Sequence, residues 1–275
     1  MTRYVGEQSA FSNVQPNTTA TIDLPVDRRY HVLWIKYKTN ANRATIETDI
    51  LRIKVMLNGI VQWEISPKEL FAIYERHGYT FIDGYLPLFF SEPWRRSPAG
   101  EDSTGWQLFG NIRTFQIDVE IAPGANAPAL ECFSQYDRKP GGLGLIRKYT
   151  RQQVPVAATG PHTLNNVPGS GSLHGFHCFE TTQGDIANVR VKVNDFEVFN
   201  ADRALAEALI QPAGGKPVAG MFPVAFDATE RVADRIDQAL AVGNQVTRSE
   251  FQLEFEMVVA NPFFLVWEFI GPANA

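Results

Sequence analysis

The densest run of residues able to hold a metal ion is HGFHCFE, from His174 to Glu180. Imidazole, thiolate and carboxylate groups are the usual protein ligands of zinc and iron. The two histidines are three residues apart, however, and on a β-strand that spacing places side chains on opposite faces. The run therefore predicts strand residues with ordinary partners rather than a metal site.

Two glycine-rich runs have some features of phosphate-binding loops. GGLG (141–144) lacks the G-x-G-x-x-G spacing, and AGGKP (213–217) has Pro217 where a phosphate loop has Ser or Thr after the lysine. The sequence also contains neither a G-x-S-x-G elbow nor an H-E-x-x-H motif. No catalytic residue and no bound cofactor is expected, although the sequence leaves open a structural Ca²⁺ ion between subunits.

Charged residues alternate with apolar ones in four short segments, which is the pattern of half-buried strands. Two segments (51–57 and 187–193) are basic on their polar face, and two (114–120 and 251–256) are acidic. The residues are Arg52, Lys54, Arg190 and Lys192 on the basic faces, and Asp118, Glu120, Glu254 and Glu256 on the acidic ones. We expect these faces to join units packed side by side, setting register and orientation. Two solvated faces are the alternative.

A long polar segment, 91–104, carries Trp94, Arg95 and Arg96 in succession. An aromatic ring beside two cations suits contact with a neighbouring protein, a lipid surface or nucleic acid. The alternative is an ordinary exposed loop. Arg147, Lys148 and Arg151 in a later basic segment have the same two interpretations.

The overall composition narrows the class of protein. The chain has 275 residues, 44% of them hydrophobic, with a net charge of −5 and only two cysteines. This length favours two domains, and the negative charge disfavours sequence-specific or general nucleic-acid binding. Two cysteines exclude a disulfide scaffold. The first fifteen residues lack the apolar run of a secretory signal, so we expect a soluble protein that folds in a reducing compartment.

An internal repeat with a constant spacing of 136 residues organises the chain. Asp49–Ile65 aligns without a gap with Asp185–Ala201, and Asn58 matches Asn194. YLPLFF (85–90) aligns at the same spacing with MFPVAF (221–226), and TFQIDVEI (114–121) with EFQLEFEM (250–257). Upstream of Asp49 the spacing fails, which predicts an insertion in one half.

The sequence pattern predicts about eight strands and one or two short helices in each half. The strands expected in the first half are 19–25, 30–38, 50–57, 60–65, 85–91, 105–110, 112–121 and 129–136. Capping residues predict helices beginning at Pro67 and after Asp202, and a further helix at 227–240. Eight strands per unit favour a mainly β chain of two tandem eight-stranded jelly rolls, at 1–138 and 154–275, joined by a connector at 139–153.

These features resemble a known family, the double jelly-roll major capsid proteins of tailless, membrane-containing icosahedral phages of the corticovirus and tectivirus type. The opening run NVQPNTTATIDLPVDRRYHVLWIKY (13–37) is similar to the start of the corticovirus coat protein. RIKVMLNG (52–59) is similar to a strand and hairpin of that family, and FQIDVEI (115–121) to its charged late strand.

The resemblance implies a homotrimer whose six jelly rolls form a pseudo-hexagonal block. Such blocks would tile an icosahedral virion shell beside neighbouring capsomers and minor capsid or vertex proteins, over an internal viral membrane, after assembly in the host cytoplasm. Two alternatives stay open. One is a two-jelly-roll enzyme, a bicupin or a glycan hydrolase; the other is a carbohydrate-binding module, for which Trp94 and Trp106 are the best candidates.

Overall fold

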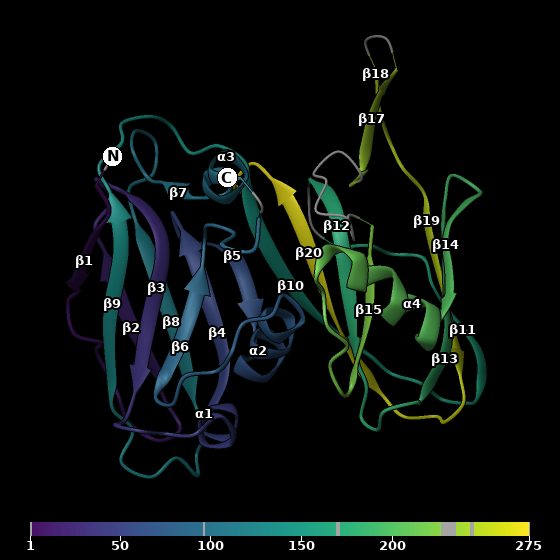
Figure 1. Ribbon diagram of the computed structural model, residues 1–275, viewed down its shortest axis with the longest axis horizontal. Helices are drawn as coiled ribbons and strands as arrows, with labels where there is room; N and C mark the ends of the chain where they lie inside the picture. Colours follow the sequence, from purple (N-terminus) through teal and green to yellow (C-terminus); the bar gives the residue numbers. More distant parts are fainter. Residues whose placement is uncertain (1, 96, 169–170, 227–234, 243–244, 275) are drawn as a thin grey trace. The chain divides into compact units, whose positions relative to one another are not determined.

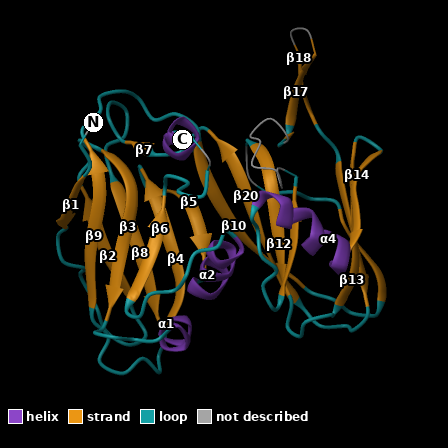
Figure 2. Cartoon of the chain, viewed as in Figure 1, coloured by secondary structure: helices purple, strands orange, loops and turns teal. Residues whose placement is uncertain are grey.

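The computed structural model describes the chain except residues 1, 96, 169–170, 227–234, 243–244 and 275. Contacts divide it into two units. Unit 1 comprises Met1–Phe71, Tyr79–Lys148 and Gly271–Ala275, and unit 2 comprises Ala72–Gly78 and Tyr149–Ile270. Strands dominate both units, and the helices are short (Figures 1 and 2).

Unit 1 is a jelly roll of two antiparallel sheets. Its strands are β1 (Tyr4–Glu7), β2 (Thr19–Leu24), β3 (Arg29–Tyr37), β4 (Ile50–Leu57), β5 (Ile60–Ile65), β6 (Tyr85–Phe89), β7 (Trp106–Gln107), β8 (Phe115–Ile121) and β9 (Leu130–Asp137). One sheet has the order β1-β9-β3-β6, and the other contains β5-β4-β8-β2. The segment expected as a strand at 105–110 is only the two-residue β7, so the eighth jelly-roll strand is β1.

Unit 2 repeats this topology. Its strands are β10 (Ile146–Val154), β11 (Gly160–Leu164), β12 (Ser172–Phe179), β13 (Ile186–Val193), β14 (Phe196–Asp202), β15 (Met221–Ala225), β16 (Ile236–Asp237), β17 (Ala239–Val242), β18 (Gln245–Arg248), β19 (Phe251–Met257) and β20 (Phe263–Gly271). The strand orders are β15-β12-β20-β10 and β11-β19-β13-β14. Most of the expected connector, from Ile146 onward, is therefore strand β10 rather than a plain linker.

The helices predicted to begin at Pro67 and after Asp202 do so, and all the described helices are short. They are α1 (Arg43–Asp49), α2 (Pro67–Arg76), α3 (Pro98–Asp102), α4 (Arg203–Ile210) and the 3₁₀ turn η1 (Gln211–Ala213). The Ser66 and Glu69 side chains accept each other's backbone N–H at the start of α2, and Asp202 accepts from Leu205 N at the start of α4. Most of the helix expected at 227–240 lies outside the described residues, and its end is wrong because β16 and β17 occupy it.

The 136-residue spacing survives in the structure. It separates the first residues of β4 and β13, of β6 and β15, of β8 and β19, and of α2 and α4. It fails earlier because α1 lies between β3 and β4, whereas β12 is joined to β13 by 180–185 alone. The insertion that the sequence predicts is therefore the α1 segment of the first half.

Each unit encloses its own apolar core. Along β8 and β19, buried and partly exposed residues alternate, as the period-two pattern predicts. Unit 1 centres on aromatic rings, with the Phe90 and Trp106 ring centroids 4.4 Å apart. Each unit also holds one free, buried cysteine, Cys132 or Cys178, and burial raises the pKa of both thiols, that of Cys132 to about 12.

Equivalent asparagines close the β4–β5 and β13–β14 hairpins. Asn58 and Gly59 have φ values of 51° and 76°, and Asn194 and Asp195 have 49° and 67°. Each asparagine also accepts, through its side chain, a backbone N–H of the segment leading into the next strand: from Arg113 at 2.7 Å and from Glu250 at 2.9 Å. The second position of such a turn favours glycine, which is what the first hairpin has.

We expect Asp195→Gly to raise the free energy of unfolding of unit 2 by about 0.5–1 kcal/mol, because it removes the steric penalty of a side chain at positive φ. Urea unfolding followed by fluorescence measures the change. Asp83→Gly, in a loop of unit 1, is the control, because Asp83 is not at positive φ and the change removes no such steric penalty. Lower stability of Asp195→Gly would contradict the prediction.

Candidate functional site

The charged faces of unit 1 lie side by side in one sheet. Strands β4 and β8 pair so that Arg52 lies opposite Glu120 and Lys54 opposite Asp118. Arg52 Nε is 3.2 Å from Glu120 Oε2, and Arg52 Nη1 donates to Glu64 Oε1 at 2.6 Å. The basic and acidic strands predicted from the sequence are therefore neighbours within the unit.

Unit 2 has the corresponding arrangement on β13 and β19. Arg190 lies opposite Glu254, 3.2 Å between Nη1 and Oε1, and Glu256 lies opposite Asn188. Lys192 lies opposite Gln252. These ion pairs are partly exposed, so each contributes at most about 1 kcal/mol to stability. Pairing within each sheet accounts for the alternating charges, and their role in subunit contacts stays a prediction.

The Trp94-Arg95 segment folds back onto unit 1. Arg95 is buried and forms an ion pair with Glu92, and the half-buried Trp94 packs edge-on against Phe89 at 6.0 Å between centroids. The expectation that Arg95 is an exposed contact residue is wrong, because Glu92 holds its guanidinium inside. Arg96 lies outside the described residues.

Glu92 is the centre of a buried charge cluster that the sequence did not reveal. It accepts hydrogen bonds from Arg147, 2.7 Å from Nε, and pairs with Arg95 on its other oxygen. Glu92 and Arg147 are both 1% exposed. The cluster joins the end of β6 to the start of β10, which are more than fifty residues apart in the chain.

A second buried polar cluster lies at one end of the β1-β9-β3-β6 sheet. His31 is fully buried, with Nδ1 2.7 Å from Ser91 Oγ and Nε2 2.9 Å from Asp137 Oδ2. Arg29 pairs with Asp137 and, at 3.2 Å, with Asp102. A histidine hydrogen-bonded to a serine on one side and an aspartate on the other is also the arrangement of the catalytic triad of hydrolases. Here Ser91 is 2% exposed, so the cluster holds loop 91–104 against the sheet rather than facing a substrate.

This cluster makes stability depend on pH. Burial lowers the pKa of His31, outweighing its hydrogen bond with Asp137; nearby Arg3 and Arg29 lower it further and Asp102 raises it. The unfolded chain regains an ordinary value near 6.5 and binds a proton that the folded chain does not. Burial raises the pKa of Asp137, but bonds from Arg29, the Lys139 amide and His31 hold it well below its usual range. Both effects remove stability on acidification, from His31 below about pH 6.5 and from Asp137 below about pH 4.

We therefore expect the free energy of unfolding to fall by about 1 kcal/mol per pH unit just below pH 6.5, and His31→Gln to flatten that slope. Urea unfolding between pH 5 and 8 measures it. His162→Gln on strand β11 is the matched control. Parallel curves for the wild type and His31→Gln would refute the assignment to His31.

The described residues contain no group of three side chains placed to bind a metal ion. The HGFHCFE run lies on and just after β12, where His174, His177, Cys178 and Glu180 are all buried. Glu180 pairs with Arg203 and accepts from Ile186 N at 2.9 Å. Glu180 therefore has protein partners from two other elements. In the part of the chain that the structure describes, no helix is long and apolar enough to cross a membrane.

Four of the exposed apolar side chains of unit 2 belong to β14 and α4. Strand β14 is the last strand of its sheet, and Phe196 on it is 76% exposed. Val198 next along is 44% exposed, and Leu205 and Leu209 of α4 are 48% and 45% exposed. We call Phe196, Val198, Leu205 and Leu209 the β14–α4 surface.

Three of the four equivalent positions of the first repeat are buried, and the fourth, Ile60, is partly buried. Strands β5 and β14 each have a β-bulge at the same place, and the bulged residue is Gln62 in β5 and Val198 in β14. The two residues are therefore equivalent. Gln62 is 2% exposed, and Glu69 and Ile73 of α2, which match Leu205 and Leu209, are 3% and fully buried. This surface is therefore covered in the first repeat and exposed in the second.

Residues of unit 1 itself cover the β5 edge. Trp63 Nε1 donates to the carbonyl of Arg147 at the start of β10, at 2.6 Å. The Gln62 amide exchanges hydrogen bonds with the Asn274 backbone, at 2.9 and 3.1 Å. The first residues of a jelly roll and the C-terminal tail thus seal this edge.

Comparison with known proteins identifies the family. The model of the viral coat protein P2 N-terminal domain matches residues 6–137, and that of the P2 C-terminal domain matches 146–273. The chain belongs to the viral coat protein P2 family. The two P2 models together span nearly the whole chain. No curated protein matches it in sequence.

Solved structures show the same fold. The major capsid protein P2 of bacteriophage PM2 superposes with a TM-score of 0.83 at 14% identity, covering 99% of this chain and 98% of that one. The STIV major capsid protein gives 0.66 at 10% identity, covering 98% and 97%. The PBCV-1 capsid protein gives 0.65 at 10% identity, covering 100% and 97%. These likenesses confirm the double jelly roll.

Proposed function

We propose that this P2-family coat protein is the major capsid protein of an icosahedral virion and that its building block is a ring of three chains. Membership of a viral coat protein family supports the first part. The second part rests on one observation, the uncovered β14–α4 surface of unit 2 beside its covered equivalent in the first repeat.

A second copy of the chain has a strand suited to that surface. Strand β1 is an edge strand, with Tyr4 49% and Val5 72% exposed. It is the first strand of its jelly roll, as β10 is of the other, and the start of β10 covers the β5 edge. Strand β1 of one copy would cover β14 of the next. Such head-to-tail contacts close into a ring, and three copies place six similar jelly rolls around its axis.

The finer assignments are part of the same proposal. Rings of this kind would assemble in the host cytoplasm and meet neighbouring rings, minor or vertex proteins and an internal viral membrane. The division into a first jelly roll at 1–138 and a second at 154–275, extended to begin with β10, suits this arrangement, because each jelly roll then occupies one of six similar positions.

Light scattering of the purified protein, followed by negative-stain imaging, tests the proposal. A stable particle with the mass of three chains, seen as hexagonal blocks or as shells, is expected. A monodisperse monomer at all concentrations would refute the ring. A monomer that binds zinc or iron would favour the two-jelly-roll enzyme instead.

A further inference from the structure

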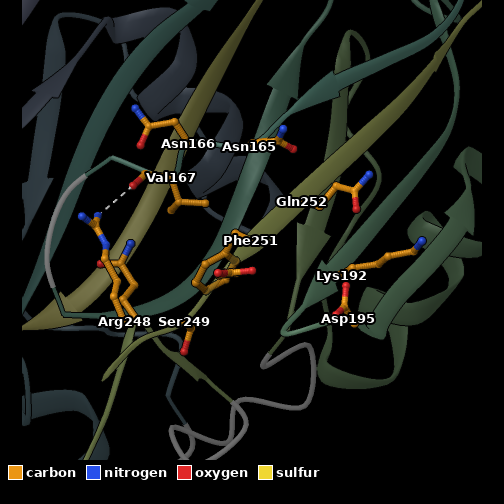
Figure 3. Close-up of a pocket in the computed structure, with 11 residues that line it drawn as sticks. Asn165, Asn166, Val167, Lys192, Asp195, Arg248, Ser249, Phe251 and Gln252 are labelled. Carbon is orange, nitrogen blue, oxygen red and sulfur yellow. Dashed lines mark hydrogen bonds between the residues drawn. The ribbon is translucent and has the colours of Figure 1, made fainter. Parts of the chain in front are cut away.

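Unit 2 contains a polar cavity of about 670 Å³ beside the β13–β14 turn. Its walls come from that turn, from the start of β19 and from residues 165–167. Figure 3 shows Lys192 and Asp195 on one side and Arg248 on the other, with Phe251 between them. This volume falls in the range of about 300–1,000 Å³ that small-molecule sites occupy.

Among the described residues that line the cavity, positive and negative charges are balanced. Lys192 and Arg248 supply two cations, and Asp195 and Glu250 supply two carboxylates. An anion such as phosphate would lie close to the carboxylates, and a cation would lie close to the two basic groups. The lining thus favours an uncharged ligand over either ion.

Amide groups supply most of the remaining polar lining, from Asn165, Asn166, Gln238 and Gln252. An amide both donates and accepts hydrogen bonds, as a sugar hydroxyl does. Sites for apolar ligands are lined mainly by hydrophobic side chains. Among the described lining residues only Val167 and Phe251 are apolar, and they provide a floor that suits the C–H face of one sugar ring.

Gln238 gives an independent indication of a ligand. Its side chain lines the cavity and the residue is only 5% exposed. Its Nε2 reaches the Pro168 carbonyl at 3.4 Å, but no described residue donates to its Oε1. Lys192 Nζ likewise has no hydrogen bond or ion pair from the described residues. A buried acceptor without a donor is unfavourable, and a ligand hydroxyl would satisfy it.

We propose that this cavity binds an uncharged oligosaccharide. Gln238 and Gln252 would hydrogen-bond its hydroxyls, Lys192 and Asp195 would bind its rim, and one ring would lie over Phe251. This binding is separate from ring assembly.

Titration calorimetry and saturation-transfer NMR on the intact protein test the proposal. The probes are maltose, cellobiose and the disaccharide of N-acetylglucosamine, with inorganic phosphate for comparison. We expect at least one disaccharide to bind, and Gln252→Ala and Lys192→Met each to weaken that binding about fivefold to tenfold.

The repeat supplies matched controls. Gln116→Ala changes the residue that the 136-residue spacing aligns with Gln252, and Lys54→Met removes a lysine from β4, the strand that corresponds to β13. Both variants should leave binding unchanged. Equal weakening by the control variants would overturn the assignment to this cavity. Absence of binding by all three disaccharides at about 20 mM, or binding of phosphate instead, would overturn the ligand class.

Discussion

Glu92→Gln is expected to lower the free energy of unfolding by about 3–5 kcal/mol. Glu92 is the carboxylate between the guanidinium groups of Arg95 and Arg147, and all three residues are buried. The neutral amide would remove the carboxylate charge that both guanidinium groups contact in the interior. Removing one partner from a buried ion cluster lowers stability far more than replacing the whole cluster with apolar residues does.

Thermal and urea unfolding measure this effect. For a unit of this size, the loss corresponds to a fall in Tm of about 10 °C or more. Glu101→Gln is the matched control, because Glu101 pairs with Arg3 at the surface, 2.9 Å apart, and its loss should change stability by less than about 1 kcal/mol. A loss below about 1 kcal/mol in Glu92→Gln would show that the buried cluster does not hold unit 1 together.

The second large effect concerns association. The double variant Phe196→Glu with Leu205→Glu is expected to weaken formation of the three-chain ring at least about 100-fold, because it places two charges in the centre of the proposed contact. Both side chains are exposed in the single chain, so its fold and Tm should be almost unchanged. Analytical ultracentrifugation over a concentration series measures the association.

Ile82→Glu is the matched control for this variant. Ile82 is 51% exposed and lies in a loop of unit 1, so it belongs to neither β14 nor α4. It should leave the ring intact. Rings that persist in the double variant, or are lost equally in Ile82→Glu, would place the subunit contact elsewhere.

The strands were the most predictable part of the fold. Alternation such as Phe115, Ile117 and Val119 inward with Gln116 and Asp118 outward can be read locally, and the structure confirms it. Strand β1 was missed because Tyr4–Glu7 has no apolar face of its own, and it is a strand only because β9 pairs with it. The end of the helix expected at 227–240 was wrong because Ile236 pairs with Leu173 of β12, a contact that helical periodicity does not reveal.

The functional surfaces were less predictable, since they depend on pairs distant in sequence. Alternation showed that Arg52 and Glu120 face the same way on their strands, but not that β4 and β8 are neighbours. Glu92 and Arg147 meet only after the jelly roll closes. Leu205 and Leu209 are four residues apart, so they share one helix face, but only the structure shows that this face is exposed.

The two cysteines allow the unfolding of each jelly roll to be timed separately. A thiol reacts with an alkylating reagent as its thiolate, and burial both shields Cys132 and Cys178 and raises their pKa. Each therefore becomes modified only while its own unit is open. The mass of labelled peptides recovered over time would give two opening rates from one unmodified chain, and would reveal whether ring formation slows one jelly roll more than the other.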